Sequence, residues 1–254
     1  MNMHKTHIAS RFGAAADSYD AASPIQLYTA RQLAERVSAL PLPDVPRVLE
    51  IGCGTGHLTR ELLPRVGGDW IITDIAAEMI YACRTKHGAT AKYVVMDGEH
   101  PSFSRDSFDL IVTSLAAQWF NDLPATLVAL APLLKPGGQI ALATLGVGTF
   151  SEWRAAHRVA GLTAATPDYP DAVQLAGMFP AMMSATVTEE LVADPNVKPI
   201  EFVRGLRAIG ATATRADRTP LTAGQLRKVL SALPTMARHG VSYHLLYAVA
   251  NRIS

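Results

Sequence analysis

Residues 48–56 read Val48-Leu49-Glu50-Ile51-Gly52-Cys53-Gly54-Thr55-Gly56, and this stretch decides the fold. The mostly apolar run over 47–51 predicts a short buried strand. Three glycines at alternate positions then predict a tight turn, because glycine adopts positive φ without strain. A helical run over 57–65 follows at once. Strand, glycine-rich turn and helix in this order are the opening unit of a parallel α/β sheet.

Strands and helices keep alternating after this unit. We predict strands over 70–73, 91–96, 108–113 and 139–145, and helices over 76–86 and 123–134. Such alternation implies parallel pairing through right-handed crossovers, and therefore a doubly wound α/β sheet. Two later β-like runs, 185–192 and 243–250, are expected to pair as an antiparallel edge.

The remaining segments lie before and after this core. A polar leader precedes an amphipathic entry helix over 26–40, and further helical patterns cover 151–165, 199–209 and 222–233. These later helices are expected as insertions on the ligand side of the sheet, where a lid or substrate pocket forms. We predict one domain over 1–254, divided into an N-terminal lid and entry helix (1–44), a cofactor-binding core (45–146) and substrate-side insertions with the final strands (147–254).

Composition and charge exclude several classes of protein. The 254 residues contain 23 Lys and Arg against 22 Asp and Glu, without the dense basic run of a nucleic-acid binder. The longest apolar stretches fall short of the roughly 20 residues that cross a bilayer, and the N-terminus has no signal core, so we expect a cytoplasmic protein. Cys53 and Cys83 lack metal-ligand spacing, so no metal site is expected.

The glycine-rich turn indicates the kind of ligand. Its pattern is G-x-G-x-G, whereas a dinucleotide fingerprint would require G-x-G-x-x-G, and His57 follows the last glycine. Pyrophosphate is therefore disfavoured. Glu50, just before the turn, would repel an anion and attract an ammonium group, so a cationic amino-acid ligand fits better.

Two further acids close the next strands. Asp74 lies some 20 residues beyond the glycines, where a nucleoside-binding carboxylate accepts the ribose hydroxyls, although Asp is also a common helix N-cap. Asp97, followed by Gly98, could accept from an adenine amino group or simply form a turn. With Glu50, these acids lie on the carboxyl edge of one sheet, where open α/β proteins bind ligands.

Taken as an ordered set, these motifs resemble those of class I methyltransferases. The set comprises residues 48–56, Asp74, Asp97, the run Phe108-Asp109-Leu110-Ile111 and the turn Leu134-Lys135-Pro136-Gly137-Gly138. The resemblance implies a Rossmann-like seven-stranded sheet with helical lid insertions, and S-adenosylmethionine as the cofactor. The cofactor residues that it implies are Glu50, Gly52, Gly54, Asp74, Ile75, Asp97, Gly98 and Ser114.

Four other segments resemble the malonyl-acyl-carrier-protein O-methyltransferases of biotin synthesis. They are residues 8–20, 115–119, 206–212 and 243–246. The resemblance implies methylation of the free carboxylate of a malonyl thioester held on acyl carrier protein, an early step of biotin synthesis. The chain has Arg207 where such sequences usually have lysine, and residues 246–249 lack their usual aromatic and glycine ending.

A malonyl carboxylate is already ionised at neutral pH, since carboxyl groups titrate near about 4, so no general base is required. We expect a clamp that aims the carboxylate instead. Arg207, whose planar fork matches a carboxylate, and Tyr19 of the leader are the catalytic candidates, with Arg154 and Arg204 as competitors for Arg207. We expect Gln118 and Trp119 to wall the methyl donor.

Other functions remain open from the sequence alone. The first alternative is a small-molecule O- or C-methyltransferase, in which a carbon or phenol acceptor would need a base, and His57 or His244 would serve. A nicotinamide oxidoreductase is opposed by the missing third glycine, and a noncatalytic cofactor-binding protein only by the intact motif set. Basic residues could receive an acidic carrier protein; they are Arg204, Arg207, Arg215, Arg218, Arg227 and Lys228.

Overall fold

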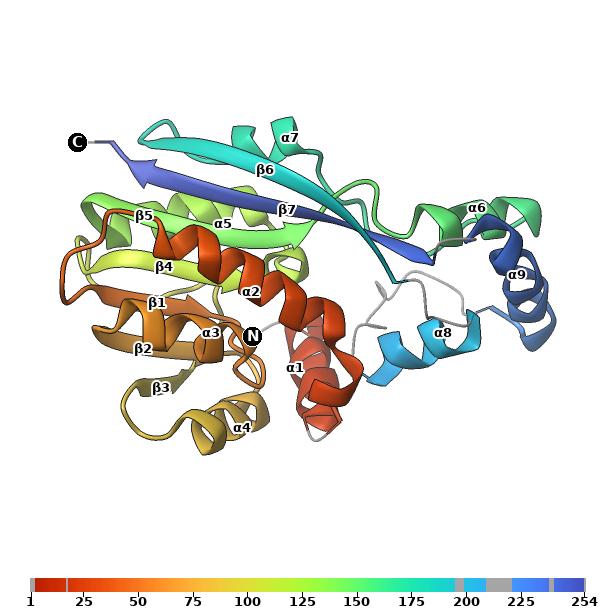
Figure 1. Cartoon of the computed structure of the whole chain (residues 1–254), viewed down its shortest axis with the longest axis horizontal. Coiled ribbons are helices and arrows are strands. Elements are labelled where there is room, and N and C mark those ends of the chain that lie inside the picture. The colour runs from red at the N-terminus through yellow and green to blue at the C-terminus, as the bar shows by residue number, and fades with distance from the viewer. Residues whose placement is uncertain (1–2, 17, 195–198, 209–220, 238–239, 254) are drawn as a thin grey trace.

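A twisted sheet runs through the molecule in the computed structural model, in the strand order β3-β2-β1-β4-β5-β7-β6 (Figure 1). The structure describes residues 3–16, 18–194, 199–208, 221–237 and 240–253. The strands are β1 (Arg47–Ile51), β2 (Asp69–Asp74), β3 (Lys92–Val95), β4 (Phe108–Ser114), β5 (Leu134–Leu145), β6 (Met183–Asp194) and β7 (Val241–Arg252).

The pairing confirms the predicted topology. β1 pairs in parallel with β2 and β4, and the parallel set continues through β3 on one side and β5 on the other. β7 pairs antiparallel with both β5 and β6, as expected of the last two β-like runs. The strand order therefore reverses between β1 and β4, and the glycine-rich turn after β1 lies at this switch point, where open α/β sheets bind ligands.

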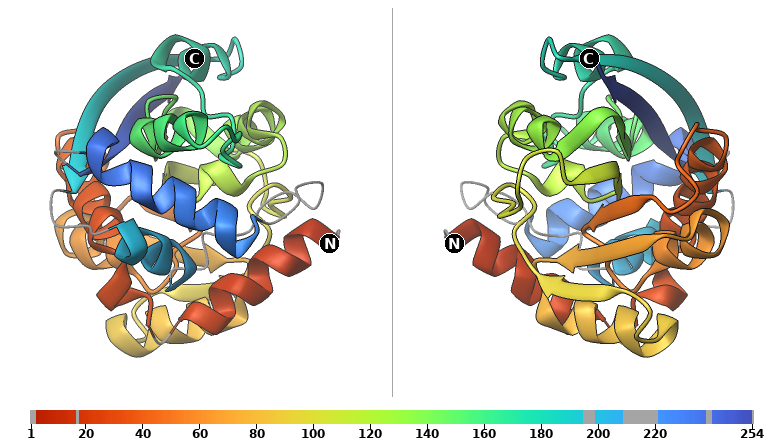
Figure 2. Two further views of the ribbon diagram at one scale, coloured as in Figure 1. Left: turned by 90° about the vertical axis from the view of Figure 1, so that its right-hand side faces the viewer. Right: turned by 90° about the vertical axis from the view of Figure 1, so that its left-hand side faces the viewer.

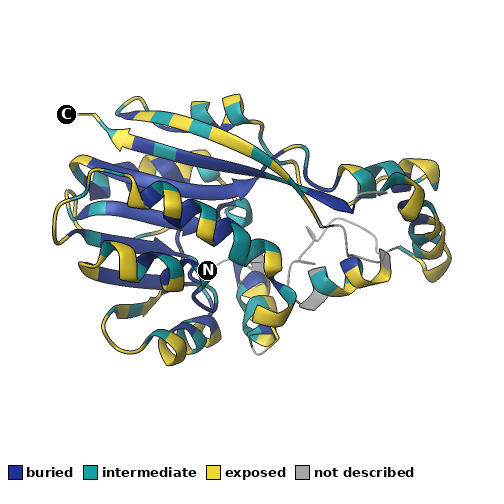
Figure 3. Cartoon of the chain, in the orientation of Figure 1, coloured by how far each residue is buried: buried dark blue, intermediate teal, exposed yellow. Residues whose placement is uncertain are grey.

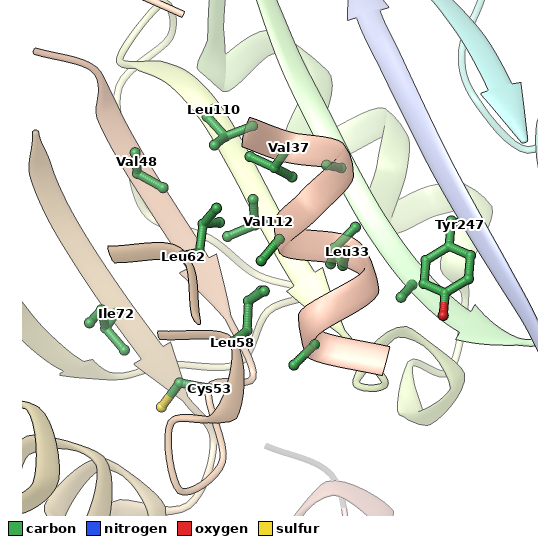
Figure 4. Packing of buried hydrophobic residues seen from close by; sticks show 14 of the residues in the cluster. Leu33, Val37, Val48, Cys53, Leu58, Leu62, Ile72, Leu110, Val112 and Tyr247 are labelled. Carbon is green, nitrogen blue, oxygen red and sulfur yellow. The ribbon is translucent and has the colours of Figure 1, made fainter. Parts of the chain in front are cut away.

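Helices cover both faces of the sheet. One layer consists of α2 (Pro24–Ser38), α3 (His57–Val66) and α4 (Ala77–His87), and the other includes α5 (Leu123–Leu130) and α7 (Ala172–Gly177). Figure 4 shows Leu33 of α2 and Leu62 of α3 packed toward Val48 and Val112 of the sheet. The central strands are buried on both faces (Figure 3), which explains their nearly continuous apolar sequences.

The alternation of side chains along β1 determines where Glu50 points. Val48 packs with the cluster under α2 and α3, whereas Leu49 and Ile51 pack with the opposite cluster. Because successive side chains of a strand point to opposite faces, Glu50 shares the face of Val48 and lies toward α3. A carboxylate is thus buried at the carboxyl end of the central strand.

A second group of helices lies beyond the carboxyl ends of the parallel strands. It contains α6 (Ser151–Val159), α8 (Pro199–Ala208) and α9 (Ala223–Met236), and it has its own small apolar core, in which Phe150 and Phe202 meet edge to face. The N-terminal helix α1 (Met3–Ala15) lies across the same end (Figure 2, left). Within the described ranges, no helix has both the length and the apolar character needed to cross a bilayer.

Several predicted boundaries were wrong. α1 and α7 were not predicted, and α6 ends at Val159 instead of continuing to 165, because Gly161 has a positive φ of 70°. The run 123–134 is α5 followed by a 3₁₀ turn, η3 (Ala131–Leu133), and β5 already begins at Leu134. Two further 3₁₀ turns, η1 (Asp20–Ala22) and η2 (Ala117–Trp119), follow α1 and β4.

Candidate functional site

A cavity opens at the carboxyl end of β1, beside the glycine-rich turn. It encloses about 850 Å³ of space between atoms, counting the part that is open to solvent. Its lining comes from the leader, the turn after β1 and the ends of β2, β3 and β4. The predicted site residues among its lining are Tyr19, Glu50, Gly52, Gly54, Asp74, Ile75, Asp97, Gly98, Ser114 and Trp119.

The glycine-rich turn forms one side of the cavity. The backbone N–H groups of Gly52 and Cys53 both donate to the carbonyl oxygen of Thr73, at 2.8 and 2.9 Å, which ties the turn to the end of β2. Gly52 has a φ of 71°, and a Cβ atom at this position would lie 2.4 Å from the Cβ of Ala116. Only glycine satisfies both conditions without displacing the loop after β4.

Glu50 is the most deeply buried acid of the site, with a relative exposure of 1%. Its Oε2 accepts a hydrogen bond from Thr59 Oγ1 at 2.7 Å, whereas its buried Oε1 has no hydrogen-bond partner among the described residues. Burial raises the pKa of Glu50 to about 7, against the lowering effect of the bonds to Thr59, and the nearby Asp74 raises it further. A buried acceptor without a partner, in a cavity wall, favours a cationic donor as ligand.

Asp74, at the end of β2, is held by two backbone donors. Its Oδ2 accepts from the N–H of Gly54 at 2.9 Å, and its Oδ1 accepts from the N–H of Ala76 at 2.9 Å, next to the start of α4. Burial raises its pKa, although these backbone bonds oppose the shift. The carboxylate thus joins the turn to the start of α4 and still lines the cavity.

Asp97 is paired with a lysine that the sequence analysis did not consider. Lys5 of α1, only 4% exposed, places its Nζ 3.0 Å from Asp97 Oδ1 and also contacts Glu99. The same ammonium lies 5.3 Å from the centre of the Phe120 ring. A buried ion pair of this kind fixes the two groups geometrically, so α1 is drawn onto this end of the cavity.

Gln118 and Trp119, the two residues after β4 that were predicted to surround the methyl donor, lie in different surroundings. Trp119 lines the cavity and meets Phe12 of α1 edge to face, with ring centres 5.3 Å apart. Gln118 is not part of the lining among the described residues. Its Nε2 donates to the carbonyl oxygen of Leu115 at 2.8 Å, and its Oε1 accepts from Thr144 at 3.3 Å, so it connects this segment to β5.

A polar cluster connects the leader to the glycine-rich turn. Asp20 accepts from Thr55 Oγ1 at 2.5 Å and pairs with Lys86 of α4 at 2.6 Å. Ser23 Oγ lies 2.8 Å from His57 Nε2. Tyr19, next to Asp20 in the chain, lines the cavity. Burial raises the pKa of its phenol above the usual value, and the carboxylates of Asp74 and Asp20 raise it further. Tyr19 therefore keeps its proton and can donate it in a hydrogen bond.

The arginines considered as partners of the substrate carboxylate lie in different parts of the fold. Arg207 falls within α8, but its side chain lies outside the described residues. The guanidinium of Arg154, which competes with Arg207 as a substrate clamp, donates to the carbonyl oxygens of Thr149 and, at 2.7 Å, Val147. These bonds hold the loop between β5 and α6.

His244 also has structural partners. Its Nδ1 accepts from the N–H of Gly148 at 3.2 Å, and its Nε2 lies 3.1 Å from Glu189 Oε2. It does not line the cavity among the described residues, whereas His57 does. Of the two histidines considered as bases, only His57 lies at the site.

Four cavity residues from the first two helices were missed: Lys5, Ile8, Phe12 and Gln26. The spacing of Ile8 and Phe12, four residues apart, indicates one face of a helix, but α1 carries too few apolar residues for its pattern to stand out. Gln26 had a clearer signal. It lies four residues before Ala30 and seven before Leu33, at a position of α2 where an apolar residue is expected.

Known proteins show similarity to the whole chain. A methyltransferase domain family matches residues 48–138. The malonyl-acyl-carrier-protein O-methyltransferase of Magnetococcus marinus is 40% identical over 251 residues, which cover 96% of this chain and 92% of the relative. The biotin biosynthesis bifunctional protein BioCD of Bordetella avium is 48% identical over 88% of this chain, and the chain spans only 48% of that protein's length.

Solved structures share the fold at low sequence identity. A chain in the complex of the Haloferax volcanii activator Trm112 with a methyltransferase aligns with a TM-score of 0.64 at 19% identity, covering 97% of this chain and 98% of its own. YcgJ of Bacillus subtilis aligns with a TM-score of 0.62 at 16% identity, over 89% and 99% of the two chains. The sequence identity to the Magnetococcus enzyme is higher than to these structures and extends over nearly the full length of both proteins. The chain therefore belongs to the malonyl-acyl-carrier-protein O-methyltransferase family of S-adenosylmethionine-dependent methyltransferases.

Proposed function

We propose that the protein methylates the free carboxylate of a malonyl thioester carried on acyl carrier protein, an early step of biotin synthesis. The observation that carries the proposal is the similarity to the Magnetococcus malonyl-acyl-carrier-protein O-methyltransferase over 96% of this chain. The match includes the leader, which lines the cavity, and the later helices, which lie beyond the carboxyl ends of the parallel strands (Figure 1). S-adenosylmethionine supplies the methyl group from its sulfonium centre when bound.

The cavity residues fit this cofactor. The unpartnered Oε1 of Glu50 suits the ammonium group, the close backbone of Gly52 and Gly54 suits the amino-acid end, and Asp74 suits the ribose hydroxyls. The adenine end is assigned to Asp97 with its neighbour Gly98. The other assigned contacts are those of Ile75, Ser114 and Trp119, with Gln118 behind this wall as a supporting residue.

The main catalytic contribution that this reaction needs from the protein is the positioning of the two substrates. A malonyl carboxylate needs no general base, so the chain must remove water from it and hold it in line with the methyl group. The protonated Tyr19 hydroxyl, on the wall of the cavity, is assigned to donate a hydrogen bond to the acceptor carboxylate. Arg207 is assigned as the cationic partner of the same carboxylate.

The carrier protein is assigned to the lid helices. Arg204 of α8 and Arg227 and Lys228 of α9 are exposed, and an acidic carrier would be attracted to them. Arg215 and Arg218 lie outside the described residues. In this proposal residues 1–44, 45–146 and 147–254 serve one domain as lid, cofactor core and substrate side, and the protein acts in the cytoplasm without binding nucleic acid, a metal or a membrane.

The test is intact-mass analysis of malonyl-loaded acyl carrier protein incubated with the protein and S-adenosylmethionine. Free malonyl-CoA and succinyl-loaded carrier serve as controls. We expect the mass of one methyl group to be added to the malonyl carrier alone. No gain in mass, with cofactor binding still measurable by calorimetry, would reject the carrier substrate and favour a small-molecule acceptor.

The Arg207→Ala variant tests the carboxylate clamp. We expect the KM for the acyl substrate to rise at least about tenfold, because a charged hydrogen bond to the carboxylate is lost, while the KM for the methyl donor changes little. Steady-state kinetics with each substrate varied in turn checks this result. Arg105→Ala, in the exposed loop before β4, is the matched control, and equal effects on both KM values would reject the clamp.

A further inference from the structure

Gln26 combines a polar side chain with a position that normally carries an apolar one. On α2 it precedes Ala30 by four residues and Leu33 by seven, and both of these are fully buried against the sheet. A helix residue at this spacing faces the same core. A buried amide at such a position is unfavourable unless it finds hydrogen-bond partners.

The carboxamide has no complete set of hydrogen-bond partners in the part of the chain that the structure describes. The Oε1 atom of Gln26 is buried and accepts no hydrogen bond from the described residues. The side chain lines the same cavity as Glu50, whose Oε1 is likewise buried and unpartnered. Two buried acceptors that have no donor among the described residues therefore belong to the wall of one cavity.

The start of α2 is fixed at this wall. Ser23, fully buried at its N-cap, lies with its Oγ 2.8 Å from His57 Nε2, and His57 begins α3 directly after the glycine-rich turn. Thr29, also fully buried, donates to the carbonyl oxygen of Ile25 at 2.7 Å. These contacts hold the first turn of α2 in place, so Gln26 is positioned on a rigid element beside the cofactor turn.

We propose that Gln26 binds the ammonium group of the cofactor's amino-acid end, together with Glu50. An ammonium carries three N–H donors and no acceptor, which matches the two buried acceptor oxygens of Glu50 and Gln26. Glu50 provides the negative charge, and Gln26 provides a neutral oxygen that completes the set without adding a second charge to an already acidic cavity. The inference concerns the cofactor alone and does not depend on the identity of the acyl acceptor.

The test is isothermal titration calorimetry on the full chain with three ligands. S-adenosylhomocysteine retains the ammonium and the carboxylate, decarboxylated S-adenosylmethionine retains only the ammonium, and methylthioadenosine has neither. We expect Gln26→Leu to weaken the first two by about tenfold or more, since a hydrogen bond to a charged group is lost. Methylthioadenosine should bind to this variant as it does to the unchanged protein.

Two further variants separate binding from folding. Gln32→Leu makes the same replacement on the same helix but outside the cavity lining, so its affinities should not change. Gln26→Glu keeps an acceptor and should bind S-adenosylhomocysteine within about threefold of the unchanged protein. Equal weakening of all three ligands by Gln26→Leu would show a structural role and overturn the proposal. Loss of affinity for S-adenosylhomocysteine alone would assign Gln26 to the carboxylate instead and would also overturn it.

Discussion

Asp74→Ala is expected to lower the affinity for S-adenosylmethionine at least about a hundredfold. The assigned bonds to the two ribose hydroxyls would be lost, and the N–H groups of Gly54 and Ala76 would lose the acceptor that now holds the turn against α4. Both losses weaken the binding of S-adenosylmethionine. Isothermal titration calorimetry with S-adenosylmethionine and S-adenosylhomocysteine measures the result directly.

Asp69→Ala is the matched control for this variant. Asp69 begins the same strand, β2, but its side chain is about half exposed, and its ion pairs with Arg47 and Lys92 are long, at 3.5 and 3.7 Å. Exposed pairs of this kind contribute little, so neither affinity nor stability should change measurably. Unchanged cofactor binding by Asp74→Ala, with the fold intact by circular dichroism, would reject the ribose assignment.

Glu50→Gln is expected to weaken cofactor binding by about a hundredfold while stabilising the ligand-free protein at alkaline pH. The ionised carboxylate is the assigned partner of the ammonium group, and glutamine would retain the shape of the side chain but not its charge. In the ligand-free protein the same charge is buried with one unpartnered oxygen, which is unfavourable. A single substitution should therefore have opposite effects on binding and on stability.

The pH dependence follows from the pKa of Glu50, which burial raises from 4.5 to about 7. Between these values the folded protein keeps a proton that the unfolded chain has released, so the free energy of unfolding falls as the pH rises. The loss amounts to about 3 kcal/mol by pH 8. Urea unfolding should show Glu50→Gln more stable than the unchanged protein at pH 8, with the difference vanishing near pH 4.5.

Cofactor binding should also release a proton. At pH 6.5 much of the buried carboxyl is protonated, and an adjacent ammonium group favours its ionised form. Calorimetric titrations in buffers of different ionisation enthalpy count the protons released. The release should disappear in Glu50→Gln and persist in Glu35→Gln, a control on the exposed side of α2. Proton release that is the same in all three proteins would assign the proton to another group.

Some of the site was determined by local sequence. The glycines, Glu50, Asp74 and Asp97 follow consecutive strands, and in a parallel sheet the ends of such strands meet at one edge, so their sequence positions were enough to bring them together. The antiparallel pairing of the last two β-like runs was also predicted from the sequence, although α8 and α9 lie between β6 and β7 in the chain. These features depend on short-range periodicity and on one topological rule.

Other features were decided only by the tertiary structure. α1 has a weak apolar pattern, and one residue that holds it at the cavity is Lys5, whose partners Asp97 and Glu99 lie more than 90 residues away. The same holds for Arg154, which could bind a carboxylate but instead donates to backbone carbonyls of its own loop. A long charged side chain can reach many partners, and the sequence does not say which of them burial will bring within range.

The amino-acid sequence by itself thus determined the sheet, its switch point and the acids that line it, because these depend on residue periods and on strand ends. The tertiary structure alone decided that the leader lines the cavity, that Gln118 bonds to Leu115 and Thr144 outside the described lining, and that Gln26 lines the cavity with an Oε1 that has no partner among the described residues. The physical reason is that hydrogen bonding and burial of a polar side chain depend on groups distant in the chain, whose positions are known only once the elements have packed.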